Sequence, residues 1–435
     1  MKRSLTLLAL LLLVTTGCAP KFNYQNYQNL MAAGDCVGSK EMVQKGQATY
    51  GKKAQLLYHL DSAMTFYQCG DFKKAAAQFN QADDLAQTLW TKSISQNAAS
   101  MLTNDMVIAY AGEDFERALI NLFTAFAYIQ AEQYDDALIE CRQLNTLLSE
   151  YNQKYEKKNV YKEDALGRWI SGILSEMDGE YSDAYIYYYE ALRAYKDYNK
   201  SYGTPTPKAL YQDLLRLSVP ADKQREAKRL ARGYKGKKTN FKKSRKLGRV
   251  VTIHLNGMAA YKVEEKFTEA TSTGPISIAF PRYVVPTIPC TNSRVTLAAE
   301  HGEKTIIKNA LAEEISDIAV KDLSDRKARI WAKTITRAVA KQVAARAAAN
   351  EVKKKQGEFA GLLAQVAGQV AANATEKADI RCWRTIPAEI HVGSAFVKPG
   401  TYTATASRCS GSTKVLDTFT VKAGQTVFLF DNTIY

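Results

Sequence analysis

The pattern of apolar and polar positions predicts helices over residues 54–200, and three stretches of this segment resemble one another. Each stretch begins with a turn of small or polar residues. An aromatic residue follows the turn, and an alanine lies three positions after the aromatic residue. The stretches are GDFKKAAAQFNQA (70–82), EQYDDALIECRQL (132–144) and GEYSDAYIYYYEA (179–191). Small residues at fixed offsets let two helices approach closely, so we expect a repeated helix-turn-helix unit.

These stretches resemble the tetratricopeptide (TPR) pattern, in which paired helices repeat along the chain and stack on one another. The copies are unevenly spaced, so the resemblance implies a TPR-like array with insertions. A fourth, partial copy is expected at EDFERALINLFTA (113–125). A helical bundle without repeats is the alternative. We assign residues 51–220 to the TPR-like domain, closed by a short capping helix.

The period of the pattern changes after residue 248, where apolar residues begin to alternate as they do in strands. Strands are expected at 249–262, 274–286, 293–300 and 381–387, and four or five antiparallel strands over 388–432. Residues 305–379 return to a helical pattern, and helices are expected at 306–323, 328–355 and 359–374. The sequence thus predicts an α+β multidomain protein whose C-terminal α+β domain spans 249–435.

Two of the helices in this domain should form an αα-hairpin packed against the sheet. The second of them, FAGLLAQVAGQVAANA (359–374), is nearly all small or apolar. Gly361 and Gly368 are seven residues apart on one face of it, where they would let a partner helix come close.

The N-terminus carries two positive residues, Lys2 and Arg3, and then an apolar run that is too short to span a bilayer. This arrangement is typical of a secretory signal peptide. Small residues before Cys18 resemble a lipobox, the bacterial pattern in which the cysteine is acylated after the signal, here 1–17, is removed. An ordinary signal peptide is the alternative. Since Ala19 follows the cysteine, the resemblance implies a lipid-anchored outer-membrane protein that faces the periplasm. Residues 18–50, from the lipidated cysteine onward, are expected to form a tether between the membrane and the first domain.

The formal net charge is +15, and most of it lies in one segment. Residues 223–249 hold 13 Lys and Arg against Glu226 alone. An exported protein meets no chromosome, so we expect no nucleic-acid partner. The segment is either a solvated linker, assigned to 221–248, or a docking site for anionic envelope glycolipid. The expected anion-binding residues are Lys237, Lys238, Lys242, Lys243, Arg245 and Lys246.

The number and spacing of cysteines and histidines limit which disulfides and metal sites the chain can form. With Cys18 lipidated, six cysteines remain in an oxidising compartment, where disulfides are allowed. Proximity in sequence favours Cys36 with Cys69 and Cys382 with Cys409, while Cys141 is expected to be a buried free thiol. Because no C-x-x-C occurs and the four histidines are scattered, no metal site and no cofactor are expected.

Three segments together resemble a family of uncharacterised Gram-negative TPR-bearing lipoproteins. They are GEDFERALINLFTAFAYIQAEQYDDALIECRQL (112–144), HLNGMAAYK (254–262) and ADIRCWRTIPAEIHVGSAFVKPGTY (378–402). The second departs from the family, whose His-Asn-Gly turn is split here by Leu255. The family has no assigned activity, but its genes often lie beside lipoproteins linked to activating cell-wall synthases. The resemblance therefore implies a location and an association with the cell envelope.

No pattern of an enzyme active site occurs in the chain: G-x-S-x-G, H-E-x-x-H and the P-loop are all absent. His254 could act as a base, although a histidine at a turn is usually structural. A cell-wall hydrolase would need an acid and base pair that the sequence does not indicate. We expect no enzyme.

Partner binding is the expected function, because repeat arrays form concave surfaces that bind peptides or proteins. Tyr185, Tyr188 and Tyr189 exceed what one buried helix face needs and are the expected partner-binding residues. Trp383 and Arg381 are either interface anchors or core residues. We therefore expect a periplasmic protein–protein interaction scaffold, active in envelope assembly or cell-wall synthesis, with a periplasmic or outer-membrane partner. Its oligomeric state is left open.

Overall fold

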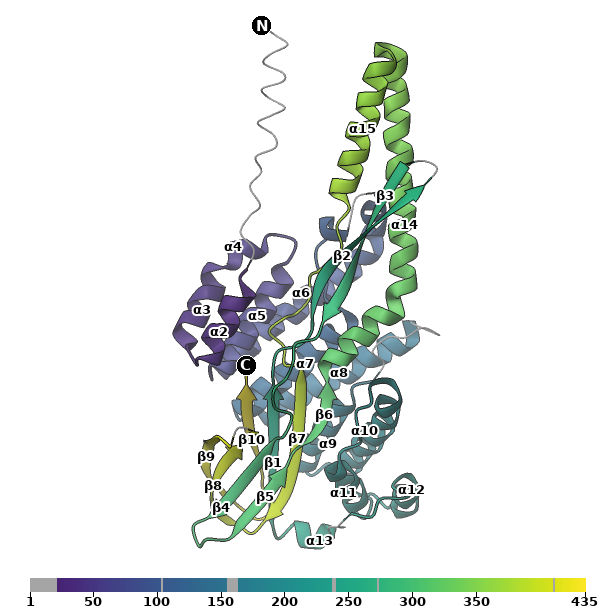
Figure 1. The fold of residues 1–435 in the computed structure, drawn as a ribbon. Helices are drawn as coiled ribbons and strands as arrows, with labels where there is room; N and C mark the ends of the chain where they lie inside the picture. The colour runs from purple at the N-terminus through teal and green to yellow at the C-terminus, as the bar shows by residue number, and fades with distance from the viewer. Residues whose placement is uncertain (1–21, 103–104, 155–162, 237–239, 272–273, 410) are drawn as a thin grey trace.

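The structure, a computed structural model, describes residues 22–102, 105–154, 163–236, 240–271, 274–409 and 411–435 (Figure 1). The signal peptide and Cys18 lie outside the described residues. Three helix pairs form the TPR-like array, as the pattern predicts. They are α5 (Gln55–Gln68) with α6 (Phe72–Leu102), α7 (Asp114–Gln130) with α8 (Tyr134–Lys154), and α9 (Ala165–Met177) with α10 (Tyr181–Tyr202).

The repeated aromatic marks the start of the second helix in each pair, since α6, α8 and α10 begin at Phe72, Tyr134 and Tyr181. The alanine three positions later is fully buried in all three, which lets the paired helices pack closely. The expected fourth copy is wrong: residues 113–125 belong to α7, the first helix of the second pair.

Short helices extend the array at both ends. Before it lie α2 (Tyr24–Ala32), α3 (Cys36–Lys45) and α4 (Gln47–Tyr50), so the tether expected over 18–50 is wrong for its described part. Tyr27 of α2 is fully buried, and a disulfide joins Cys36 to Cys69 at the end of α5. The other short elements are η1 (Asp105–Val107), α11 (Lys208–Leu217), α12 (Gln224–Leu230) and α13 (Phe241–Ser244).

Two four-stranded sheets form the body of the C-terminal half. The first has the order β10-β1-β7-β6, with β1 parallel to β10 and antiparallel to β7. Its strands are β1 (Gly248–Asn256), β6 (Ala310–Glu314), β7 (Glu389–Val397) and β10 (Thr426–Thr433). The second has the order β5-β4-β8-β9. Its strands are β4 (Arg294–Ala299), β5 (Lys304–Lys308), β8 (Gly400–Ser407) and β9 (Thr413–Val421).

Three expectations for this half are wrong. Residues 306–314 form strands rather than the start of a helix, because Ile307 points into the small core shared by the two sheets. The segment 381–387 forms no strand, since its groups bond the repeat helices instead. The last strand, β10, lies parallel to its neighbour rather than antiparallel.

A long projection, which we call the arm, leaves the body (Figure 1). It consists of the hairpin β2 (Tyr261–Thr271) and β3 (Gly274–Val284) with the helices α14 (Ile315–Gln356) and α15 (Glu358–Thr375). The predicted αα-hairpin is therefore present, but it packs on β3 at its base and otherwise extends away from both sheets. A Cβ on Gly368 would lie 3.0 Å from the Cβ of Ala345, so the expected close approach at this glycine is confirmed.

Candidate functional site

The inner face of the TPR-like array is occupied by the chain's own first sheet. Val251, Ile253 and Leu255 of β1 belong to the same continuous apolar core as the repeat helices. The ring of Phe430 on β10 lies 5.5 Å from that of Phe126 on α7, centroid to centroid. The surface that would hold a partner in an open repeat array is thus filled from within the molecule.

Two of the three tyrosines expected to bind a partner are buried by other parts of the chain. Tyr188 is fully buried, and its hydroxyl donates to Glu176 at 2.9 Å. Tyr185 is 2% exposed, and its hydroxyl donates to Glu226 at 3.2 Å. Only Tyr189 is partly exposed, with the guanidinium of Arg193 over its ring. The prediction that Tyr185 and Tyr188 contact a partner is therefore wrong, because contacts within the chain bury both rings.

A buried ion network joins the array to the first strand of the sheet. Arg249 of β1 donates to Asp213 at 2.6 Å and to Glu176 at 3.1 Å. Arg216 donates to the same Glu176 at 2.6 Å. Burial alone would raise the pKa of Glu176, but the two guanidinium groups hold it below its usual value.

Trp383 and Arg381 are core residues rather than interface anchors. Trp383 is 1% exposed, and its backbone N–H donates to Glu116 of α7 at 2.7 Å. Arg381 bonds both oxygens of Asp379 and donates to the backbone carbonyls of Lys53 and Ile108, each at 2.9 Å. The prediction of partner contacts at these two residues is wrong, because the segment RCWRTIP (381–387) hydrogen-bonds to groups of the N-terminal half and joins it to the sheet.

The same segment completes a buried site around Asp61 on α5. Thr385 donates to this carboxylate at 2.8 Å, and so do the hydroxyls of Tyr24 and Tyr50, at 2.7 and 2.8 Å. Burial raises the pKa of Asp61 to about 6, although the three hydrogen bonds oppose this. The site holds helices α2, α4 and α5 to the C-terminal half and has no free group for a ligand.

Of the two expected disulfides, Cys36–Cys69 is confirmed and Cys382–Cys409 is wrong. Cys409 bonds Cys290 instead, which links the end of β8 to the segment before β4. Cys382 is a buried thiol beside Lys262, in the segment that contacts the repeat helices. Cys141 is a buried free thiol, as expected, and burial raises its pKa to about 12.

The histidines of the first sheet form a buried polar cluster between the two sheets. His391 lies 2.7 Å from Glu389, and His254 lies 2.9 Å from the hydroxyl of Thr433. Burial lowers the pKa of His254 to about 4. Both side chains are about 5% exposed, so neither reaches a surface from which it could act on a substrate. Within the described ranges, no group of His, Cys, Asp and Glu is placed to hold a metal ion.

The Lys and Arg residues of the basic segment are exposed where they are described, except for Arg249, which is buried. Lys242, Lys243, Arg245 and Lys246 lie on α13 and the turn after it, whereas Lys237 and Lys238 lie outside the described residues. Arg245 stacks on the ring of Tyr181 at 5.7 Å.

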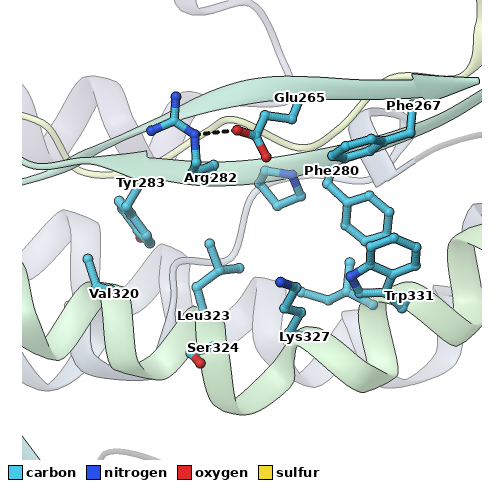
Figure 2. Close-up of a pocket in the computed structure, with 12 residues that line it drawn as sticks. Glu265, Phe267, Phe280, Arg282, Tyr283, Val320, Leu323, Ser324, Lys327 and Trp331 are labelled. Atoms are coloured by element: carbon cyan, nitrogen blue, oxygen red, sulfur yellow. Dashed lines mark hydrogen bonds and ion pairs between the residues drawn. The ribbon is translucent and has the colours of Figure 1, made fainter.

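The best-formed apolar pocket lies on the arm, between the β2–β3 hairpin and α14 (Figure 2). Its volume is about 270 Å³. Phe280 and Trp331 stack with ring centroids 4.1 Å apart on one side, and Leu323 covers another. Lys327 lines the opening, and across from it Arg282 bonds Glu265 at 2.5 Å (Figure 2).

A separate, uncovered apolar row lies on the same arm along α15. Phe359, Leu362, Leu363, Val366 and Val370 are 52–75% exposed, and their spacing places them on one side of the helix. No charged residue occurs between Glu358 and Glu376 to interrupt the row. These residues were missed as a site because a run of small and apolar residues is expected to be buried. The absence of charged residues from this run was the sequence signal that could have identified the row.

The other helix of the arm adds apolar and positively charged groups. Ile335, Val339 and Val343 of α14 are 41–61% exposed, at a spacing of four residues. Seven basic residues and only two acidic ones lie between positions 333 and 375. Gly357, with a φ of 91°, ends α14 and makes the turn into α15. The arm therefore combines a bare apolar surface with positive charge.

No described helix has both the length and the apolar character that crossing a membrane requires. No protein-family model and no curated protein matches the chain.

The comparison with solved structures gives weak matches. Nearly identical TPR-like repeats from Podosopora anserina, named after kinesin light chain, give a TM-score of 0.30 at 13% identity. The match covers 47% of this chain and 88% of that one. MamA of MSR-1 gives a TM-score of 0.27 at 11% identity, with coverage of 48% and 89%. Scores this low do not assign a fold family, so the repeat assignment rests on the helix pairs themselves.

Proposed function

We propose that the protein is a non-catalytic scaffold that binds a protein partner through the arm. The observation that supports this most directly is the uncovered apolar row Phe359–Val370, set on the outer part of a projection of which the base contributes to the main core. Exposed contiguous apolar surface on a soluble domain marks an interaction site. The inner face of the repeat array cannot be the partner-binding surface, because the first sheet fills it.

The partner surface that fits is an apolar helix flanked by acidic side chains. The row on α15 runs at positions 359, 363, 366 and 370, alternating steps of four and three, which is the spacing of a seam between packed helices. Lys353, Lys354 and Lys355 are exposed at the far end of α14 and would select acidic neighbours.

We further propose that this scaffold is anchored through Cys18 at the periplasmic face of the outer membrane and works in cell-wall or envelope assembly. The apolar run before Cys18 and the resemblance to TPR-bearing lipoproteins support the location. Two disulfides, Cys36–Cys69 and Cys290–Cys409, fit an oxidising compartment. A purified protein with an unmodified Cys18 thiol and an intact Met1 would contradict the anchor.

Crosslinking in cells tests the arm as the partner site. Leu363→Asn together with Val370→Asn should remove the captured partner, because polar side chains at the centre of the seam leave the interface unpaired. Val415→Asn is the matched control, since Val415 is 62% exposed and Val370 63%, but on β9. Equal capture by the arm variant and the control would contradict the proposal.

The second candidate is binding of anionic glycolipid through the basic segment. It is favoured by the exposure of Lys242, Lys243, Arg245 and Lys246, which have no acidic partner among the described residues. Changing these four to Gln should weaken binding to vesicles that contain lipid A, and salt should weaken it as well. The control changes Lys353, Lys354 and Lys355 to Gln. If that control lost as much binding, the segment would not be the site.

A further inference from the structure

A second groove lies on the repeat array, between helices α6, α7 and α8. Its volume is about 600 Å³, within the range of ligand sites. Arg117 and Asn121, one turn apart on α7, line it. Phe126, which packs on the sheet, is nine residues from Arg117 and so points to the opposite side of the helix. The groove therefore lies on the outside of the array, away from the filled inner face.

Arg117 is a buried cation that makes no ion pair with a carboxylate of the described chain, although Asp83 and Asp114 act on it at longer range. The residue is 2% exposed, and its guanidinium lies 4.6 Å from the ring of Trp90 and 5.5 Å from that of Tyr151. Its Nε and Nη1 make no hydrogen bond. The other buried arginines of the described chain each bond a carboxylate: Arg216, Arg249, Arg337 and Arg381. A buried charge without a partner is strongly destabilising, so this one has the character of a site awaiting an anion.

Asn121 supplies a second unpaired group in the same groove. Its amide nitrogen donates weakly to the carbonyl of Arg117 at 3.5 Å, while its Oδ1 is buried and accepts no hydrogen bond. The groove thus offers N–H donors from Arg117 and one acceptor from Asn121. A ligand that satisfies both carries a carboxylate and an adjacent N–H group, which is the arrangement at the C-terminal residue of a peptide.

The rim of the groove selects among anions. Asp83, Asp84 and Glu150 line it, and all three disfavour a doubly charged ligand such as phosphate. Gln87, Thr91, Gln143 and Thr146 add exposed hydrogen-bonding side chains suited to a peptide backbone. The groove is therefore matched to one carboxylate with neutral or basic residues before it.

We propose that this outer groove binds the free C-terminal carboxylate of a peptide or protein, with Arg117 as the carboxylate-binding residue and Asn121 accepting the adjacent N–H. The inference goes beyond the scaffold function proposed for the arm, because it concerns another face of the molecule and another ligand chemistry. Each site can fail without the other.

The first test uses N-acetyl-L-alanine, which has both groups, and N-acetyl-L-alaninamide, which lacks the carboxylate. At equal ionic strength and pH 7.5, the acid should raise the melting temperature of the full chain and the amide should not. Inorganic phosphate should raise the melting temperature no more than the amide does. An equal response to acid and amide, or a larger one to phosphate, would overturn the proposal. This measurement needs no variant and so does not depend on Arg117 being replaceable.

The second test measures binding of a fluorescent pentapeptide pool with free C-termini by polarisation, against the same pool amidated. Arg117→Met should weaken binding of the free-acid pool at least tenfold and leave the amidated pool unchanged. Arg193→Met is the matched control, because Arg193 also lies over a tyrosine ring, at 5.9 Å, but outside the groove. Unchanged binding by Arg117→Met, in a protein with the wild-type circular dichroism spectrum, would refute the site.

Discussion

The inner face of the repeat array is covered by another part of the chain, whereas the arm leaves apolar side chains exposed. The inner face is rich in aromatic and charged side chains, and the chain's own sheet covers them, with Arg249 and Trp383 bonded across the junction. The bare row of α15 carries aliphatic side chains and one aromatic residue, Phe359, and nothing within the described chain covers Phe359 or Val370. The tyrosine-rich helix α10 is therefore buried internally, while the bare row on the arm is marked by its lack of charge.

The largest expected effect is the loss of the ion network at the inner face. Arg249→Met removes one of the two cations that pair with Asp213 and Glu176 and leaves only Arg216, and breaking a buried pair in this way costs about 3–5 kcal/mol. Urea denaturation of the full chain should show this loss. Arg245→Met, four residues earlier and exposed, should change the free energy of unfolding by less than about 0.5 kcal/mol. Similar losses in both variants would mean that the junction does not stabilise the fold.

The histidine cluster should make stability depend on pH. The pKa of His254 is about 4 in the folded protein and about 6.5 when unfolded, so the unfolded chain binds the proton more tightly. The free energy of unfolding therefore falls as pH drops from about 6.5 through 4, by about 3 kcal/mol from this group, and levels off below the folded-state pKa. His254→Gln should flatten this part of the curve in thermal unfolding. His301→Gln, at an exposed position, should leave it unchanged.

Removal of one hydroxyl should lower stability at the buried Tyr188 and not at its neighbour Tyr189. Tyr188→Phe leaves Glu176 and Arg249 short of one hydrogen bond each and should destabilise by about 1–2 kcal/mol. Tyr189→Phe should change stability by less than about 0.5 kcal/mol. Guanidinium denaturation distinguishes the two. Equal effects would show that Tyr188 is not tied into the junction.

The smallest effect on stability is expected at the arm. Val370→Asn should change the free energy of unfolding by less than about 0.5 kcal/mol, because the side chain is already 63% exposed. Thermal denaturation of the purified variant measures this. A loss of 2 kcal/mol or more would mean that the row supports the fold itself and is not a free surface.

The repeat helices were predictable because their pattern is local. Ala75 sits three residues after Phe72 within one helix, and this spacing is visible along the sequence. The same holds for the αα-hairpin and for the disulfide Cys36–Cys69, which closes a short loop between neighbouring helices.

The parts that were not predictable depend on contacts between distant segments. Tyr188 meets Arg249, and Trp383 meets Glu116, across separations that no periodicity reveals. Cys409 bonds Cys290 because strand order brings β4 beside β8, not because the two are near in sequence. Arg117 makes no ion pair with a carboxylate of the described chain, and that can be seen only once the surrounding helices are in place.

The parallel pairing of β10 with β1 has a consequence for how the molecule is made. Phe428 and Phe430 of β10 pack on Tyr134, Tyr67 and Phe126 of the N-terminal half, which lie about 300–360 residues earlier in the chain. Those rings therefore stay uncovered in a growing chain until β10 has been synthesised and can pair with β1. Completion of the shared core is thus a late step of folding, and deletion of β10 would leave aromatic rings of the repeat helices exposed.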